Sequence, residues 1–136
     1  MRKKILTVDD EPDILEILYT VLSGAGYEVF QATNGRDALT LAKEKRPDLI
    51  ILDIKMPGMD GGKVTDVLKN YRETRTIPII YLSGLVNAGE VDEESHVLGS
   101  RIGDMFFVSK SESPEKLLEI VEKNIGPGMP SDLQSQ

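Results

Sequence analysis

Short apolar runs alternate with amphipathic stretches along the chain, and this alternation predicts its secondary structure. Strands are predicted where β-branched and aromatic residues cluster between turn residues, at 4–8, 27–32, 48–52, 77–82 and 104–108. Helices are predicted where apolar residues recur every three or four positions, from residue 12 to the glycine at 24, at 35–46, around 64–71 and at 114–125. Residues 85–99 are punctuated by glycine and carry Asp92-Glu93-Glu94, and there we expect a loop and one exposed helix.

Individual residues refine the helix boundaries and faces. Pro12 and Pro114 suit the first turn of a helix, and Asp60 is typical of a helix cap. The apolar face predicted for the first helix consists of Ile14, Ile17, Leu18, Val21 and Leu22. That of the third consists of Val64, Val67, Leu68 and Tyr71.

Five strands that alternate with five helices predict βαβ units and therefore a parallel sheet. The fold class is α/β, a doubly wound (βα)5 sandwich with helices on both faces. The size of the chain favours the strand order 2-1-3-4-5. We expect one domain over residues 1–125. Residues 126–136 lack a hydrophobic period and are rich in glycine and proline, and we expect them to form a flexible tail or the start of a linker.

Charge and composition exclude several classes of function. The chain has 16 Lys and Arg against 23 Asp and Glu, a net charge of −7, and no basic stretch, so we expect no direct binding to nucleic acid. It has no cysteine for a disulfide or a thiolate site. No apolar run reaches the roughly 18 residues of a membrane helix, and we expect a cytoplasmic protein that does not bind membranes.

Polar residues follow four of the predicted strands at the point where each strand ends. Asp9 and Asp10 follow the first strand, Asp53 the third and Ser83 the fourth, and Lys110 stands shortly after the fifth. Because parallel strands end at the same edge of a sheet, we expect these side chains to converge. Ionised carboxylates ~4 Å apart repel by about 4 kcal/mol per pair at an effective dielectric near 20, so the cluster requires a cation. Oxygen ligands with room for water suit Mg²⁺.

These residues stand in motifs that resemble the receiver domain of two-component response regulators, with the flavodoxin-like fold of chemotaxis regulators. The resemblance covers about residues 3–125 and is carried by Val8-Asp9-Asp10-Glu11-Pro12, Leu52-Asp53 with Met56-Pro57-Gly58-Met59-Asp60-Gly61, Leu82-Ser83-Gly84 and Lys110. It implies a bacterial-type signalling phosphoprotein whose only catalysis is its own phosphorylation and slow autodephosphorylation.

The resemblance also implies roles for single residues. Asp53 would be the phosphoacceptor, which takes a phosphoryl group from the phosphohistidine of a histidine kinase or phosphotransfer protein. Ser83 and Lys110 would hold the phosphoryl oxygens. Phe107 would be an aromatic switch residue that turns inward as Ser83 moves toward the phosphoryl group.

The implied cofactor is Mg²⁺. Asp10, Asp53 and the backbone carbonyl of Lys55 would bind it directly, and Asp9 would act through water. The implied partner on the output side is a downstream protein target or a tethered output domain, and the family leaves room for a dimer that forms on phosphorylation.

The chain departs from the family pattern on the far side of the site. Lys110 is followed by Ser111, where proline is usual, and we predict a trans or a strained peptide bond there. The 27 residues from Ser83 to Lys110 exceed the usual spacing, which predicts an insertion. Leu85 cannot orient a water molecule as a polar side chain would, and this predicts slow autodephosphorylation.

Three other functions remain as alternatives. A phosphatase of the haloacid dehalogenase type also uses an aspartate after a strand, but it needs a second aspartate two residues later, where this chain has Lys55. A flavodoxin-type nucleotide or flavin module needs a phosphate loop after the first strand, and Asp9-Asp10-Glu11 would repel phosphate. An adaptor that keeps the fold without being phosphorylated is the third.

Overall fold

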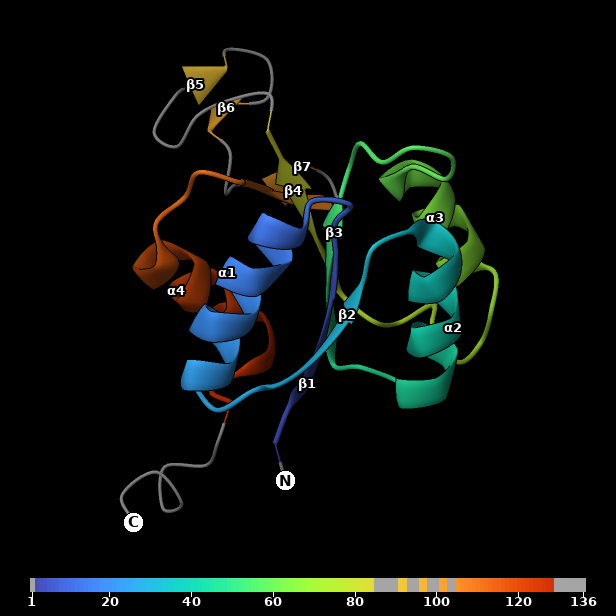
Figure 1. Ribbon diagram of the computed structural model, residues 1–136, viewed down its shortest axis with the longest axis horizontal. Coiled ribbons are helices and arrows are strands. Elements are labelled where there is room, and N and C mark those ends of the chain that lie inside the picture. Colours follow the sequence, from blue (N-terminus) through green and yellow to red (C-terminus); the bar gives the residue numbers. More distant parts are fainter. Residues whose placement is uncertain (1, 85–90, 93–95, 98–100, 103–104, 129–136) are drawn as a thin grey trace.

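The computed structural model describes residues 2–84, 91–92, 96–97, 101–102 and 105–128, and in this part a sheet lies between two pairs of helices (Figure 1). One pair is α1 with α4, and the other is α2 with α3. In chain order the elements are β1 (Lys4–Val8), α1 (Pro12–Gly24), β2 (Glu28–Ala32), α2 (Gly35–Lys45), β3 (Leu49–Asp53), α3 (Gly61–Lys69), β4 (Ile79–Ser83), β5 (Val91–Asp92), β6 (His96–Val97), β7 (Arg101–Ile102), β8 (Met105–Ser109) and α4 (Pro114–Ile125).

The main sheet has the order β2-β1-β3-β4-β8-β7. Its first five strands pair in parallel, so the predicted order 2-1-3-4-5 is confirmed, with β8 as the fifth parallel strand. The sixth strand, β7, is antiparallel to β8 and covers the edge that β8 would otherwise expose.

The helix predicted within residues 85–99 is wrong for the part of this stretch that the structure describes. Val91–Asp92 and His96–Val97 are the strands β5 and β6, which pair with each other in antiparallel fashion. The described chain therefore has four helices instead of the predicted five. The physical reason is that glycines and clustered acids give the sequence of this stretch no apolar stripe for a helix to bury, and the described residues of β5 and β6 pair with each other instead. Residues 85–90, 93–95 and 98–100, with Leu85 among them, lie outside the described part.

The core divides into two apolar clusters, one on each face of the sheet. Successive residues of β3 point to opposite faces, so Leu49 and Ile51 join the cluster under α1 and α4. Ile50 and Leu52 join the cluster under α2 and α3. All four side chains are at most 1% exposed, as expected for the central strand of a parallel sheet covered on both sides. The carboxylate that follows is therefore held on a rigid support.

Helix faces follow the sequence pattern only in part. In α1 the buried residues are Leu15, Leu18 and Leu22, whereas Ile17 is 55% exposed. The predicted face was wrong at Ile17 because the apolar stripe of this helix is wider than the strip of sheet that it covers. The third helix ends at Lys69, so Tyr71 lies beyond it and is exposed.

The cap of α3 and the end of α4 are fixed by hydrogen bonds. The Asp60 side chain accepts a hydrogen bond from the backbone of Lys63, which confirms its predicted role as a cap. After α4, the backbone carbonyl of Gly126 accepts a hydrogen bond from the buried Tyr27 hydroxyl at 2.7 Å. The carbonyl of Gly128 accepts one from the backbone of Lys3 at 3.3 Å. Residues 126–128 thus pack on the domain, while residues 129–136 lie outside the described part.

No helix in the described ranges combines the length and the apolar character needed to cross a membrane.

Candidate functional site

The carboxyl ends of the parallel strands bring the predicted polar residues together. Asp9 directly follows β1, Asp53 is the last residue of β3, and Ser83 is the last residue of β4. Lys110 directly follows β8, and its backbone N–H donates a hydrogen bond to the carbonyl of Ser83 at 2.9 Å. One carboxylate oxygen from each of Asp9, Asp10 and Asp53 lies within 4.8 Å of the others. The sequence-based expectation that these side chains converge is therefore met.

The Lys110 ammonium lies at the centre of this cluster. Its Nζ atom is 3.1 Å from Asp9 Oδ2 and 3.1 Å from Asp53 Oδ2. A third carboxylate, Glu11, approaches it at 3.4 Å through Oε1. Asp9 and Asp53 are 0% and 2% exposed, so both ion pairs lie in a poorly solvated environment where charges interact strongly.

The same two carboxylates are also held by the backbone. Asp9 Oδ1 accepts a hydrogen bond from the N–H of Glu11 at 2.9 Å. Asp53 Oδ1 accepts one from the N–H of Lys55 at 3.3 Å. Asp9 Oδ2 is buried and, among the described residues, has the Lys110 ion pair but no aligned hydrogen bond. It can therefore accept a further partner.

Burial and mutual repulsion shift the pKa values of these groups. Burial raises the pKa of Asp53 to about 6, the Asp9 charge adds to the increase, and the Lys110 ammonium opposes it. Burial also raises the pKa of Asp9, although the Glu11 N–H and the Lys110 ammonium offset part of that increase. For Lys110, burial alone would lower the pKa, but the two buried carboxylates outweigh it and raise the pKa above its usual value. Lys110 thus carries a positive charge at neutral pH.

The cluster opens to solvent through a cleft of about 260 Å³. Asp10, Glu11 and Lys55 line the cleft, together with the strand-end residues Asp53 and Ser83. Ser83 is only 6% exposed, whereas the Lys55 side chain is exposed. The cleft therefore connects the Asp53 carboxylate with solvent.

A glycine allows the loop after β3 to close tightly. The N–H of Gly61 donates a hydrogen bond to the carbonyl of Ile54 at 2.9 Å. A Cβ atom at Gly61 would lie 2.6 Å from the Asp53 carbonyl oxygen, which no side chain can tolerate without a backbone shift. The position of Asp53 therefore depends on the absence of a side chain at position 61.

Phe107 lies behind the site on the face of the sheet that α3 covers. It is half-buried, and its ring stacks on Tyr81 with a distance of 5.3 Å between ring centroids. The Tyr81 hydroxyl lies 2.8 Å from Thr65 Oγ1, which donates to the carbonyl of Gly61 at 2.8 Å. Contacts thus run from Phe107 through α3 to the loop that follows Asp53.

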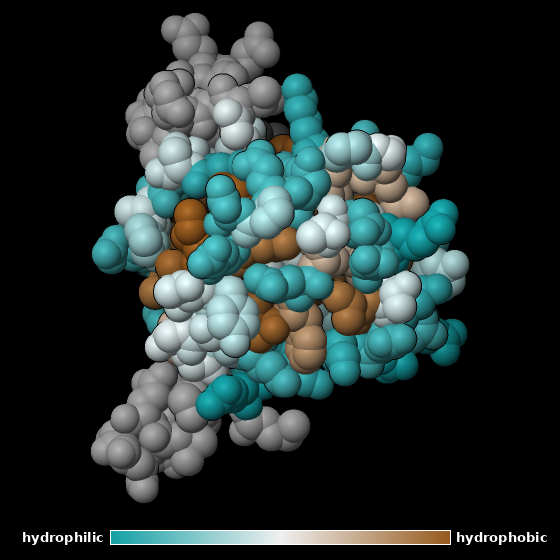
Figure 2. Space-filling model, in the orientation of Figure 1, coloured by the Kyte–Doolittle hydropathy of each residue, from teal (hydrophilic) through white to brown (hydrophobic). Residues whose placement is uncertain are grey.

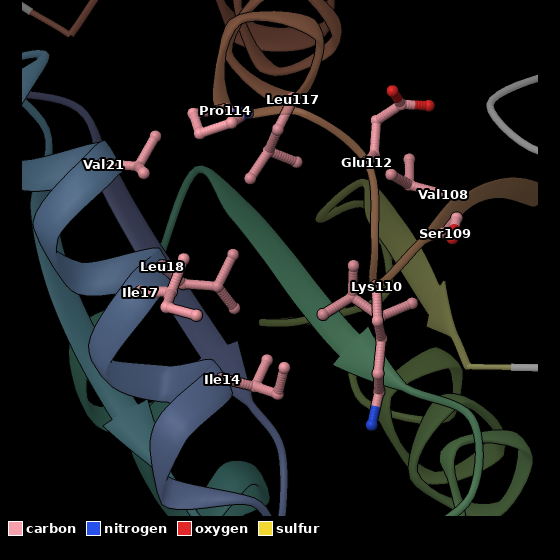
Figure 3. A pocket seen from close by; sticks show the side chains of 11 residues that line it. Ile14, Ile17, Leu18, Val21, Val108, Ser109, Lys110, Glu112, Pro114 and Leu117 are labelled. Atoms are coloured by element: carbon pink, nitrogen blue, oxygen red, sulfur yellow. The ribbon is translucent and has the colours of Figure 1, made fainter. Parts of the chain in front are cut away.

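An apolar hollow of about 50 Å³ lies beside the cluster, between α1 and α4 (Figure 3). Ile14, Ile17 and Leu18 of α1 form one wall, and Leu117 of α4 contributes to the opposite wall. The aliphatic stem of Lys110 lines the hollow (Figure 3), while its Nζ atom contacts Asp9 and Asp53 of the acidic cluster. Figure 2 shows apolar surface reaching solvent between these two helices.

The sequence did not single out two residues of this site. Glu11 contacts Lys110, and its position directly after the acid pair was a signal that could have been used. Ser109 is 3% exposed and is the last residue of β8, which was predicted to end at Val108. Because the predicted strand ended one residue early, Ser109 was not recognised as a buried polar residue next to Lys110. The Lys110–Ser111 peptide bond is trans, one of the two outcomes predicted.

Comparison with known proteins places these features in a family. Residues 5–122 match the family described as response regulator receiver domain. The chain is 36% identical over 125 residues to the DNA-binding response regulator MtrA of Mycolicibacterium smegmatis, an alignment that covers 92% of this chain and 51% of that protein. The chain thus spans about half the length of that relative.

Solved structures show the same similarity. The chemotaxis protein CheY4 of Vibrio cholerae matches with a TM-score of 0.75 and 28% identity, over 92% of this chain and 100% of CheY4. The receiver domain of the sensor histidine kinase PA1611 of Pseudomonas aeruginosa PAO1 matches with a TM-score of 0.75 and 25% identity, over 93% of this chain and 99% of that domain. That structure carries a magnesium ion coordinated in its active site cleft.

Proposed function

Because this chain belongs to the response regulator receiver domains of two-component signalling systems, we propose that it is a phosphorylation-activated switch with Asp53 as the phosphoacceptor. The supporting observation is the position of the Lys110 ammonium, 3.1 Å from both Asp9 and Asp53 at the edge of the sheet. This arrangement places a fixed positive charge beside a carboxylate that can act as a nucleophile and opens both to a cleft.

In the proposed reaction, an ionised Asp53 oxygen attacks the phosphorus of a phosphohistidine. The new O–P bond forms as the P–N bond breaks, and the electron pair of that bond returns to the imidazole. The product on this chain is an acyl phosphate. With a pKa of about 6, the Asp53 carboxyl is mostly ionised at neutral pH and thus competent to attack.

The transferred group spreads its negative charge over three equatorial oxygens, so transfer depends on positioning and on charge neutralisation. We assign the neutralisation to the Lys110 ammonium and a hydrogen bond to the Ser83 hydroxyl. Ser83 and Lys110 are joined through the backbone hydrogen bond between them, so they can act on the same group. The ammonium would exchange part of its contact with Asp53 for the phosphoryl oxygens.

The acidic residues also fit a resident Mg²⁺. Three carboxylate oxygens converge within 4.8 Å, and the buried Asp9 Oδ2 can accept another partner. Oxygen-only ligands suit this ion. We assign direct binding to Asp10, Asp53 and the Lys55 carbonyl, with Asp9 acting through water, and the bound ion would supply positive charge to the phosphoryl oxygens.

Incubation with acetyl phosphate and Mg²⁺, followed by intact-mass measurement, tests this function. Wild type is expected to gain one phosphoryl group, Asp53→Asn none, and the exposed control Asp60→Asn the same as wild type. No gain in wild type would indicate the alternative of a non-phosphorylated adaptor. An undiminished gain in Asp53→Asn would mean that another residue is the acceptor.

The same experiment addresses the phosphatase alternative. Such an enzyme would release many equivalents of inorganic phosphate per chain, whereas a switch retains one group and releases it slowly. The position two residues after Asp53 carries the exposed cation of Lys55 instead of an acid, which favours the switch. Slow release remains a prediction that rests on Leu85, and a phosphoryl half-life of only seconds with Mg²⁺ would contradict it.

We further propose that the protein carrying the phosphohistidine, a histidine kinase or phosphotransfer protein, covers the hollow between α1 and α4. The stem of Lys110 lines this hollow, and the Lys110 ammonium contacts Asp53. A donor that delivers a phosphoryl group to Asp53 must therefore approach the opening of the hollow. Ile17, 55% exposed, lines it.

The docking step can be separated from the chemistry. Ile17→Ser should slow phosphorylation by a kinase that modifies the wild type, but should leave phosphorylation by acetyl phosphate unchanged. Tyr19→Ser is the matched control, because Tyr19 is 49% exposed on the same helix and does not line the hollow. Equal effects of the two variants on the kinase reaction would refute the placement. On the output side we propose a protein target or a tethered output domain, with no nucleic acid bound directly by this chain.

A further inference from the structure

Three serines flank Lys110, one at the end of β8 and two in the loop that leads to α4, and hydrogen bonds define the path of this loop. Ser113 caps α4 by accepting a hydrogen bond from the N–H of Lys116 at 3.2 Å. The N–H of Glu112 donates to the carbonyl of Ser109 at 3.1 Å, which closes a turn around Lys110. Lys110 is thus the second residue of a turn that begins at the last residue of β8 and closes just before the cap of α4.

Ser109 contributes its side chain to this turn. Its Oγ atom accepts a hydrogen bond from the N–H of Ser111 at 3.1 Å and lies 2.9 Å from Ser111 Oγ. Ser109 is 3% exposed and stands opposite Ser83 in the register of β8 with β4. This buried hydroxyl thus links the two residues that flank Lys110, Ser109 and Ser111, and restrains the backbone around Lys110.

The position of the Lys110 backbone matters because the Lys110 side chain must reach two buried carboxylates at once. The stem runs along the apolar hollow, and the ammonium must meet Asp9 and Asp53 together at 3.1 Å each. A misplacement of about 1 Å can slow a reaction that depends on positioning by roughly 100-fold. The family usually fixes this point of the chain with a proline after the lysine, and here Ser111 takes that place.

We propose that Ser109 is a positioning residue for phosphoryl transfer, which acts through Lys110 by holding the turn with its buried hydroxyl. The Ser109–Ser111 hydrogen bonds replace the restraint that a proline would supply. Ser109 does not touch the phosphoryl group itself. This inference rests on the proposed function of Lys110, and the experiments below are chosen so that the two can fail separately.

The first experiment measures the rate of phosphorylation by acetyl phosphate with Mg²⁺ over a range of acetyl phosphate concentrations. Ser109→Ala removes the acceptor, and the maximal rate is expected to fall by about 10- to 100-fold, as positioning effects of this kind do. The control Ser113→Ala removes a hydroxyl from the loop that precedes α4. Its phosphorylation rate should stay within about twofold of wild type because the Ser113 hydroxyl caps α4. Thermal unfolding of each variant verifies that it is folded.

A double-mutant cycle separates positioning from a general structural defect. Because Ser109 acts through Lys110, Ser109→Ala should add no further loss in a Lys110→Ala background. If the Lys110→Ala rate is too slow to measure, the same cycle is run on the affinity for beryllofluoride, a phosphoryl analogue whose binding needs no turnover. A loss of equal size in both backgrounds would refute the proposal, as would a wild-type rate in Ser109→Ala.

A crystal structure of Ser109→Ala tests the proposal independently of phosphorylation. The Lys110 ammonium is expected to move away from Asp9 or Asp53. An ammonium that keeps both 3.1 Å contacts would overturn the role of Ser109 even in a chain that is phosphorylated normally. Conversely, a displaced ammonium in a chain whose wild type accepts no phosphoryl group would support the role of Ser109 and reject the proposed function.

Discussion

The raised pKa of Asp53 predicts that this carboxylate destabilises the folded protein at neutral pH. Burial and the nearby Asp9 charge disfavour ionisation in the folded state, whereas the carboxyl group of the unfolded chain titrates normally. Replacing Asp53 by Asn keeps the shape and removes the charge. Lys110 retains Asp9 and Glu11 as partners. We therefore expect Asp53→Asn to be more stable than wild type when Mg²⁺ is absent.

The size of the effect follows from the two pKa values. The folded-state pKa of about 6 lies above the unfolded value of 3.8, so the favourable contribution of the protonated group is fully present below pH 3.8 and is lost as the pH rises through about 6. The full shift of roughly two pKa units corresponds to about 3 kcal/mol. Relative to low pH, the advantage of Asp53→Asn should be about 0.5 kcal/mol at pH ~4 and about 3 kcal/mol at pH ~7.5. Asp53 is 2% exposed, so solvent does little to screen this effect.

Urea unfolding followed by circular dichroism, in chelator and at several pH values, measures this difference. Asp60→Asn is the control, because its exposed carboxylate caps α3 and Asn caps helices equally well. An Asp53→Asn variant that is less stable than wild type near neutral pH would refute the reasoning, because the Lys110 ion pair would then outweigh the cost of burial. A difference that does not vary with pH would refute it as well.

Three further predictions concern the metal, the loop after β3 and the contacts behind the site. Mg²⁺ at about a hundred times its dissociation constant should raise the unfolding free energy of wild type by about 2.7 kcal/mol, and Asp10→Asn should gain much less; equal gains in urea unfolding would exclude Asp10 as a ligand. Gly61→Ala should lower the unfolding free energy by about 1–3 kcal/mol and slow phosphorylation by acetyl phosphate, because its methyl group would overlap the carbonyl at the end of β3. Gly62→Ala, whose added methyl group would have Asp60 Oδ1 as its nearest neighbour at 3.4 Å, should do neither, and matching behaviour of the two variants would contradict the close-approach argument. Tyr81→Phe should lower the unfolding free energy by about 1 kcal/mol through loss of a half-buried hydrogen bond, whereas Tyr19→Phe, an exposed control, should leave it unchanged.

The sheet and the site could be predicted because their determinants are local in the sequence. The run Leu49–Asp53 is a buried strand that ends in an acid, and its neighbours are likewise buried strands with a polar residue at the end, Asp9 after β1 and Ser83 in β4. Once the strands are parallel, topology alone brings Asp9, Asp53 and Lys110 together. No detail of packing was needed for that step.

The parts that were missed depend on contacts that a local pattern does not contain. The exposure of Ile17 reflects how much of the sheet α1 covers and where α4 lies beside it. The strand β7 exists through pairing with β8 at the sheet edge, which the acids and glycines before it did not indicate. The role of Ser109 required the strand end to be known to within one residue, and strand ends are the least certain part of a sequence-based assignment.

The packing of residues 126–128 has a consequence for how this domain can be joined to others. A Cβ atom at Gly128 would lie 2.7 Å from the backbone of Gly26, so this glycine fits against the turn that follows α1, at the opposite end of the sheet from Asp53. The Tyr27 hydroxyl and the backbone N–H of Lys3 hold the same segment by donating hydrogen bonds to the carbonyls of Gly126 and Gly128. A domain attached after residue 128, natural or engineered, would start from a fixed point at the end of the sheet that is remote from the phosphodonor. A fluorescent label fused there would therefore leave the approach to Asp53 open to the phosphodonor.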